Sequence, residues 1–243
     1  MSRSSRMRTV TDALPAQIAQ RDGLAYSLWL PDPGRPVRGG VVILHGAGSC
    51  KESHHDFARA LLGAGFAALA FDQRGHGASD GPMDARVADD VASMAAVLRE
   101  GIGDPGAPIA LRGSSMGGLL AILAAARVDA RAVVAICPAS AAGLRRGIAA
   151  GRFGFAADID ALEGLLALCD LNAMVESLEA PLLILHAEGD EQVPVEHSRE
   201  LATHMRAAGS RLIAVPGGHH RSIQHDGEMQ AVSLRFLERS LSR

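Results

Sequence analysis

Residues 110–123, ALRGSSMGGLLAIL, combine a short apolar run, a turn of glycine and serine, and a second apolar run. The first run has the length of a buried strand, and the second has the composition of a helix. Residues 113–117 fit the pattern G-x-S-x-G, in which a sharp strand-to-helix turn presents a nucleophilic serine between glycines that leave room for neighbouring backbone. Centring the pattern on Ser114 would put Arg112 in place of the first glycine. The spacing therefore selects Ser115.

Outward from this stretch, strand-like apolar runs alternate with helical stretches. The predicted strands lie at residues 41–45, 66–71, 108–113 and 132–137 and within 181–190 and 211–218. The predicted helices cover residues 52–62, 84–100, 116–127, 196–208 and 226–241. Such alternation builds βαβ units, so we expect an α/β fold with a mostly parallel, doubly wound sheet and helices on both faces. Two extended runs around Asp22-Gly23, within residues 16–30, predict a hairpin that adds antiparallel edge strands.

One region interrupts the alternation. Residues 141–179 mix helical and loop character between the fourth and the fifth predicted strand. We expect this segment to be a short cap inserted over the ligand crevice, and an ordinary crossover helix with long loops is the alternative. Residues 13–243 then form a single α/β domain, and residues 1–12 are expected to be a disordered leader.

Composition and charge exclude several classes of partner. Hydrophobic residues make up 48% of the 243 residues and charged residues 21%, the profile of a compact protein with a sizeable core. A net charge of −3 argues against non-specific binding to nucleic acid or to an anionic membrane. Aromatic residues are only 3%, so platforms for stacking nucleobases are scarce. We expect no nucleic-acid partner and no membrane partner.

Cysteine usage and the N-terminus predict a cytoplasmic location. Cys50, Cys137 and Cys169 lie far apart and form no C-x-x-C pair, so free thiols in a reducing compartment are the simplest interpretation. The basic start of the chain is not followed by the apolar region of a signal peptide. No run reaches the roughly 18 apolar residues that a membrane helix needs.

A nucleophilic serine needs a base, and the base needs an orienting carboxylate. In an open parallel sheet such groups converge at the carboxyl ends of the strands. Glu188, Asp190 and Glu191 follow the predicted strand LLILHA, and His219 and His220 follow RLIAVPGG. The order serine, acid, histidine is one of three known for this constellation. Strand position alone leaves open which acid and which histidine take part.

Five segments together resemble the α/β-hydrolases, in their serine aminopeptidase-like and carboxylesterase-like branch. They are LHGAG (44–48), FDQRGHGASDG (71–81), GSSMGG (113–118), HAEGDEQVPVEHSREL (186–201) and VPGGHHRS (215–222). In order and spacing they match that family's H-G-x-G oxyanion loop, D-x-R-G-x-G-x-S turn, nucleophile elbow, acid loop and histidine loop. The resemblance spans residues 39–241 and implies an α/β-hydrolase fold with a Ser-His-Asp triad.

The resemblance also implies a role for single residues of the triad. Ser115 takes the nucleophile position, and Asp190 takes the acid position because G-D-x-x-V-P is the family's usual context for it. Glu188 and Glu191 are then solvated loop charges. The family's histidine loop commonly reads P-G-x-x-H, which favours His220 as the base, and a loop one residue shorter would make His219 the base.

An oxyanion hole follows from the same resemblance. The backbone N–H groups of Met116, next after the nucleophile, and of Ala47 would hold the oxygen of the tetrahedral intermediate. His45, at the end of its strand, is implied to be a structural histidine that bonds loop backbone.

Two further patterns suggest ligands that we do not expect. His54-His55-Asp56 and the histidines at 219, 220 and 225 lack a recognised metal-ligand spacing, so solvated helix and loop residues are the default. The glycines at 75, 77 and 81 miss the G-x-G-x-x-G spacing of a dinucleotide site. We expect neither a metal nor a cofactor.

The implied function is a serine hydrolase that cleaves small to medium carboxylic esters through an acyl-enzyme. Its expected partner is a small-molecule ester, and its expected state is a monomer or a homodimer. The same triad would equally serve an amide or peptide, thioester or lysophospholipid hydrolase, because fold and triad do not determine the substrate. A non-catalytic binding protein with the α/β-hydrolase fold is the alternative from another class.

Overall fold

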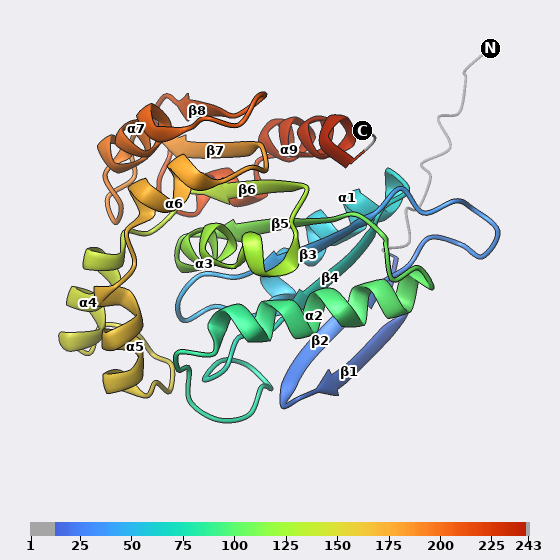
Figure 1. Ribbon diagram of the computed structural model, residues 1–243, viewed down its shortest axis with the longest axis horizontal. Helices are drawn as coiled ribbons and strands as arrows, with labels where there is room; N and C mark the ends of the chain where they lie inside the picture. Colours follow the sequence, from blue (N-terminus) through green and yellow to red (C-terminus); the bar gives the residue numbers. More distant parts are fainter. Residues whose placement is uncertain (1–12, 242–243) are drawn as a thin grey trace, which may run out of the picture.

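A computed structural model describes residues 13–241 as one eight-stranded sheet in the order β1-β2-β4-β3-β5-β6-β7-β8 (Figure 1). The strands are β1 (Gln17–Arg21), β2 (Leu24–Trp29), β3 (Gly40–Leu44), β4 (Ala67–Phe71), β5 (Ile109–Ser114), β6 (Ala132–Ile136), β7 (Leu182–Ala187) and β8 (Arg211–Val215). From β4 to β8 all neighbouring strands pair in parallel. The α/β prediction is confirmed, and the expected leader at residues 1–12 lies outside the described residues.

The predicted hairpin forms the edge of the sheet. β1 pairs antiparallel with β2, and β2 pairs antiparallel with β4. Asp22 and Gly23 connect the two strands with φ angles of 56° and 78°. Positive φ at both turn residues matches the right-handed twist of the strands, which is why an Asp-Gly pair favours a hairpin.

Helices cover both faces of the sheet (Figure 1). They are α1 (His55–Gly63), α2 (Val87–Ile102), α3 (Met116–Ala124), α4 (Ala141–Ala149), α5 (Ile159–Ala167), α6 (Leu171–Ser177), α7 (Val195–His204), α8 (Ser222–His225) and α9 (Gly227–Leu241). One apolar core lies between the sheet and α2, α3, α6 and α7, and a second lies between the sheet and α1, α8 and α9. Because side chains alternate along a strand, Leu111 of β5 joins the first core and Ala110 the second.

Four predicted helix bounds are wrong by a few residues. The helix predicted from residue 52 begins at His55, after a 3-10 helix at Lys51–His54. The helix predicted from residue 84 begins at Val87, since the Asp84 carboxylate accepts the Arg86 N–H (2.8 Å) in a turn before the helix. The helix predicted over 116–127 ends at Ala124, and its last turn tightens into a 3-10 helix at Ala126–Val128. The helix predicted over 196–208 ends at His204, because the next residue is extended.

The chain between β6 and β7 folds into α4, α5 and α6. α6 packs against α3 and α7, as a crossover helix does, whereas α4 and α5 pack against each other and lie to one side of the sheet (Figure 1). Ser140 and Asp158 begin these two helices, each accepting a backbone N–H with its side chain. Residues 141–169, which hold both helices, are called the α4–α5 segment below. No helix in residues 13–241 combines the length and the apolar composition that crossing a bilayer requires.

Candidate active site

Ser115 lies between the end of β5 and the start of α3, with a φ of 55° that a residue with a side chain rarely adopts. Close backbone packing explains the glycines on either side. A Cβ on Gly113 would overlap the carbonyl of Gly117, and a Cβ on Gly117 would overlap the carbonyl of Leu44. The turn therefore has the strained geometry that the G-x-S-x-G pattern predicts, and Ser115 is partly exposed at its tip.

Asp190 and His220 meet at the carboxyl ends of β7 and β8. The Asp190 side chain is fully buried, and its Oδ2 lies 2.7 Å from His220 Nδ1 and 3.3 Å from His186 Nε2. Its Oδ1 accepts the N–H groups of Gln192 (2.8 Å) and Val193 (2.9 Å). Burial disfavours the charged carboxylate, but these hydrogen bonds outweigh burial and hold the pKa of Asp190 well below its usual range.

The neighbouring histidine is placed differently. His219 is exposed, its N–H donates to Ser222 Oγ (3.0 Å), and its ring contacts the Arg221 N–H (3.3 Å). His220 is buried and contacts the carboxylate. The loop after β8 thus brings one ring to Asp190 and leaves the other in solvent.

The serine turn adjoins this acid–base pair through β6. The Ser115 N–H donates to the Ile136 carbonyl over 2.8 Å. The next residue, Cys137, offers a sulfur that lies within 4.8 Å of ligand atoms of Asp190 and His220. No hydrogen bond joins the Ser115 hydroxyl to His220 in the described part of the chain. Catalytic hydrogen bonds of this kind often tighten only in the complex with substrate.

Cys137 is a feature that the sequence analysis did not connect to the site. It is fully buried with a φ of 42°, and burial together with the nearby Asp190 charge raises the pKa of its thiol to about 12. Thiol, carboxylate and imidazole are together a donor set for a soft metal ion. In this structure, however, Asp190 and His220 bond to each other, and the high pKa keeps the thiol protonated. In the sequence, the one sign that Cys137 lies near the site is that it directly follows a strand that neighbours β5.

The loop after β3 packs directly against the serine turn. A Cβ on Gly46 would lie 3.3 Å from both the Ser115 Cβ and the Ser114 carbonyl. The two N–H groups proposed for an oxyanion hole, of Ala47 and Met116, have no protein acceptor within residues 13–241. Both are therefore available to a ligand oxygen beside Ser115.

His45 holds this loop as a neutral imidazole. Its Nε2 accepts the Gln73 N–H (3.0 Å), so Nδ1 carries the hydrogen and donates to the Gly46 carbonyl (2.8 Å). Burial lowers the pKa of His45 to about 4, which keeps the ring uncharged. This is the backbone-bonding role that the resemblance implied.

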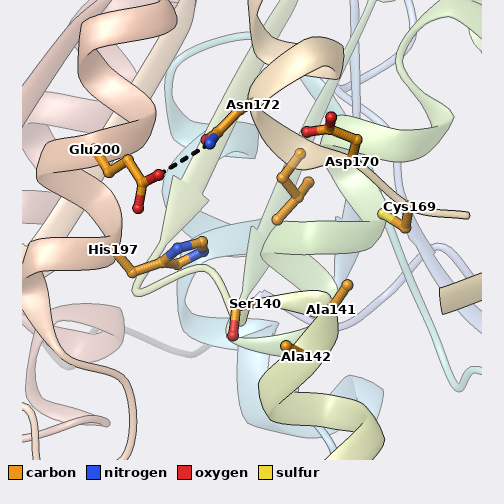
Figure 2. Close-up of a pocket in the computed structure, with 9 residues that line it drawn as sticks. Ser140, Ala141, Ala142, Cys169, Asp170, Asn172, His197 and Glu200 are labelled. Carbon is orange, nitrogen blue, oxygen red and sulfur yellow. Dashed lines mark hydrogen bonds between the residues drawn. The ribbon is translucent and has the colours of Figure 1, made fainter. Parts of the chain in front are cut away.

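A pocket of about 300 Å³ lies between α4, α6 and α7 (Figure 2). It is lined by the starts of α4 and α6 and by α7, through Ser140, Ala141, Ala142, Cys169, Asp170, Leu171, Asn172, His197 and Glu200. Asn172 donates to Glu200 across it (3.0 Å; Figure 2). Ala139, which precedes the lining, donates its N–H to the Ser115 carbonyl (3.0 Å). Ala139 thus contacts the serine turn directly, and the pocket lining begins at the next residue, Ser140.

Comparison with known proteins gives one family and several relatives. A model of the family described as Hydrolase_4, serine aminopeptidase S33, matches residues 35–159. Human monoglyceride lipase is 31% identical over 137 residues, which are 52% of this chain and 44% of the lipase, so the match spans less than half of that relative.

Solved structures share the fold at lower identity. A monoacylglycerol lipase of Paleococcus ferrophilus superposes with a TM-score of 0.66 at 24% identity, covering 90% of this chain and 98% of the lipase. Est1E of Butyrivibrio proteoclasticus, solved with ferulic acid, gives 0.70 at 22% identity, covering 94% and 100%.

Proposed function

The chain belongs to the serine aminopeptidase S33 family of α/β-hydrolases, and from this membership we propose that it is a serine hydrolase that cleaves carboxylic esters through an acyl-enzyme. The observation that carries the proposal is the hydrogen bond between His220 Nδ1 and Asp190 Oδ2, beside the strained turn at Ser115. The two lipases among the similar proteins support an ester as the substrate class.

The proposed chemistry follows from the tautomer of His220. A carboxylate only accepts hydrogen bonds, so the hydrogen of His220 is on Nδ1 and Nε2 keeps a free lone pair. Nε2 takes the proton of Ser115 Oγ as that oxygen attacks the ester carbonyl, and then returns it to the leaving alcohol. Water repeats the sequence and releases the acid. Asp190 stabilises the imidazolium that forms in each half-reaction.

Negative charge on the carbonyl oxygen is proposed to be held by two backbone donors. The N–H groups of Met116 and Ala47 are free of protein acceptors in the described chain, and both belong to segments packed around Ser115. Removing one such donor from a hydrolase typically costs about 2.7–4 kcal/mol of transition-state stabilisation.

The α4–α5 segment, which is the larger part of the cap expected at residues 141–179, is proposed to select small to medium, uncharged or weakly polar esters. The segment turns apolar residues such as Leu144, Leu162 and Leu166 toward the core beside the serine turn. Its Arg145 pairs with Glu163 within the segment, so this cation is already neutralised. Arg146 and Arg152 of the same segment are exposed, so none of its three arginines offers an unpaired charge to the core, which favours an acyl group that carries no charge.

A fluorophosphonate probe, which reacts with activated serines, tests the proposal. We expect labelling of the wild-type protein and of Ser114→Ala, the matched neighbour, and none of Ser115→Ala. Absence of labelling in the wild-type protein would favour a non-catalytic binding protein. Turnover of p-nitrophenyl esters of increasing acyl length, beside matched thioester, anilide and lysophospholipid substrates, then separates the ester proposal from the other hydrolase classes.

A further inference from the structure

Two imidazoles, of His45 and His76, hold the peptide groups on either side of Ala47. His45 Nδ1 donates to the Gly46 carbonyl, which shares a peptide plane with the Ala47 N–H. The Gly48 N–H, which shares the next plane with the Ala47 carbonyl, donates to His76 Nε2 (3.1 Å). A trans peptide is planar, so holding one polar group determines the direction of the other. His45 therefore holds the plane that contains the proposed oxyanion donor, and His76 holds the plane that follows Ala47.

His76 can accept the Gly48 N–H only in one tautomer. Its Nδ1 lies 3.0 Å from the Arg74 carbonyl, which is only an acceptor, so Nδ1 carries the hydrogen. Nε2 is then left with a lone pair for Gly48. The ring is 5% exposed, and burial lowers the pKa of His76, which favours this uncharged form. The Arg74 carbonyl thus prepares His76 as an acceptor.

The other face of His76 touches the α4–α5 segment. Its ring stacks on Phe155, with centroids 4.3 Å apart and planes at 25°, and meets His45 edge-on at 4.8 Å. Backbone hydrogen bonds lock the same contact, because the Ala156 N–H donates to the Gly75 carbonyl (3.2 Å) and the Ala156 carbonyl accepts from Met83 (2.9 Å). The row of rings Phe155, His76 and His45 thus runs from the segment to the loop that holds Ala47.

We propose that His76 is a positioning residue through which the α4–α5 segment sets the direction of the Ala47 N–H. The inference rests on the proposed function, because this direction matters for catalysis only if Ala47 is an oxyanion donor. A correctly placed segment holds His76 against Gly48 and keeps the Ala47 N–H aimed at the reacting oxygen. A displaced segment releases the His76 ring, which then loses both its bond to the Gly48 N–H and its edge contact with His45, so the peptide planes on both sides of Ala47 can turn.

Three substitutions separate the acceptor from the ring. His76→Phe keeps the stacking ring and loses the acceptor, and His76→Gln keeps an acceptor near Nε2 and loses the ring. Phe155→Leu leaves His76 intact and removes its stacking partner. Leu168→Ala, at an 85% exposed position of the same segment, is the control.

The expected signature is a loss in kcat with little change in KM, since an oxyanion donor acts on the transition state. We expect kcat to fall about 10- to 100-fold in His76→Phe, and clearly less in His76→Gln, on the scale of a misaimed rather than a deleted donor. Phe155→Leu should lower kcat about threefold or more, and Leu168→Ala should match the wild type. Equal losses in both His76 variants, wild-type kcat in His76→Phe, or a rise in KM alone would overturn the proposal.

A structural readout keeps this test independent of the enzyme activity. In Ser115→Ala protein labelled with ¹⁵N, a scalar coupling across the Gly48 N–H to His76 Nε2 hydrogen bond should be visible by NMR and should shrink in Phe155→Leu. A protein that shows the coupling but neither reacts with fluorophosphonate nor turns over esters would contradict the proposed function. A protein that turns over esters without the coupling would contradict the role of His76.

Discussion

His220 Nδ1 donates to Asp190 Oδ2 over 2.7 Å, which joins the loops after β7 and β8 by one buried hydrogen bond. His219, the preceding residue, lies in solvent. We expect His220→Ala to lower kcat/KM for a p-nitrophenyl ester by at least about 10³-fold, because a triad loses most of its rate when the base is removed. His219→Ala, the matched control, should stay within about twofold of the wild type. The reverse pattern would make His219 the base.

Stability should fall as the solution becomes mildly acidic. The pKa of His45 is lowered from 6.5 to about 4 in the folded chain, and burial also lowers that of His54. Between these pH values the two histidines are protonated in the unfolded chain but not in the folded chain. The free energy of unfolding therefore decreases as pH falls from about 6.5 to 4. His45 alone contributes about 3 kcal/mol of this loss. The free energy of unfolding, measured with urea at several pH values, should change less with pH in His45→Gln than in the wild type. An unchanged dependence on pH would contradict this assignment.

Lys51 pairs with one buried carboxylate and one exposed carboxylate. Only the buried pair should contribute substantially to the free energy of unfolding. Its Nζ lies 2.7 Å from Asp72, whose side chain is fully buried, and 2.8 Å from Glu52, whose side chain is 55% exposed. Asp72→Asn removes the buried counter-charge of Lys51, leaves only the screened Glu52 pair, and should cost about 3–5 kcal/mol of unfolding free energy. Glu52→Gln should cost less than about 1 kcal/mol, because water screens that pair. Similar losses in chemical denaturation would argue against the buried pair.

Gly75 and Gly81 have nearly the same φ angle, but only Gly75 is closely packed by other atoms. Their φ angles are 76° and 70°, yet a Cβ on Gly75 would overlap the Ala156 carbonyl, whereas nothing lies within 4 Å of one on Gly81. Gly81→Ala should therefore cost only the left-handed strain of about 1–2 kcal/mol. Gly75→Ala should cost more and should loosen residues 153–158, seen as faster limited proteolysis there. Equal proteolysis rates in the two variants would disprove a specific contact at Gly75.

The strands and the serine turn could be predicted because their signals are local. Apolar β-branched runs predict buried strands wherever they occur, and the Asp22-Gly23 pair predicts its hairpin without reference to the rest of the chain. The pattern around Ser115 is equally local, because a side chain at either glycine would overlap atoms of the same turn or of the adjacent strand β3. Helix ends were less accurate, because single hydrogen bonds such as that from Arg86 to Asp84 decide them.

The parts of the site that escaped prediction depend on neighbours distant in sequence. Strand position left both His219 and His220 open as partners of the acid, because the path of a loop decides between them; only the P-G-x-x-H spacing of the resemblance favoured His220, which is the ring that contacts Asp190. Cys137 lies beside Asp190 only because β6 and β7 are paired. His76 was part of a recognised motif, yet its contact with Phe155 follows from where the α4–α5 segment returns to the sheet.

The α4–α5 segment leaves and rejoins the molecule at one place. Ser140 before α4 and Asp170 before α6 both line the pocket between α4, α6 and α7, so the ends of the segment are neighbours in space. A stretch with adjoining ends can be lengthened, shortened or exchanged for another without pulling β6 away from β7. The fold can therefore accept a change of length in this stretch, provided that Phe155 and Ala156 still reach the loop at Gly75 and His76.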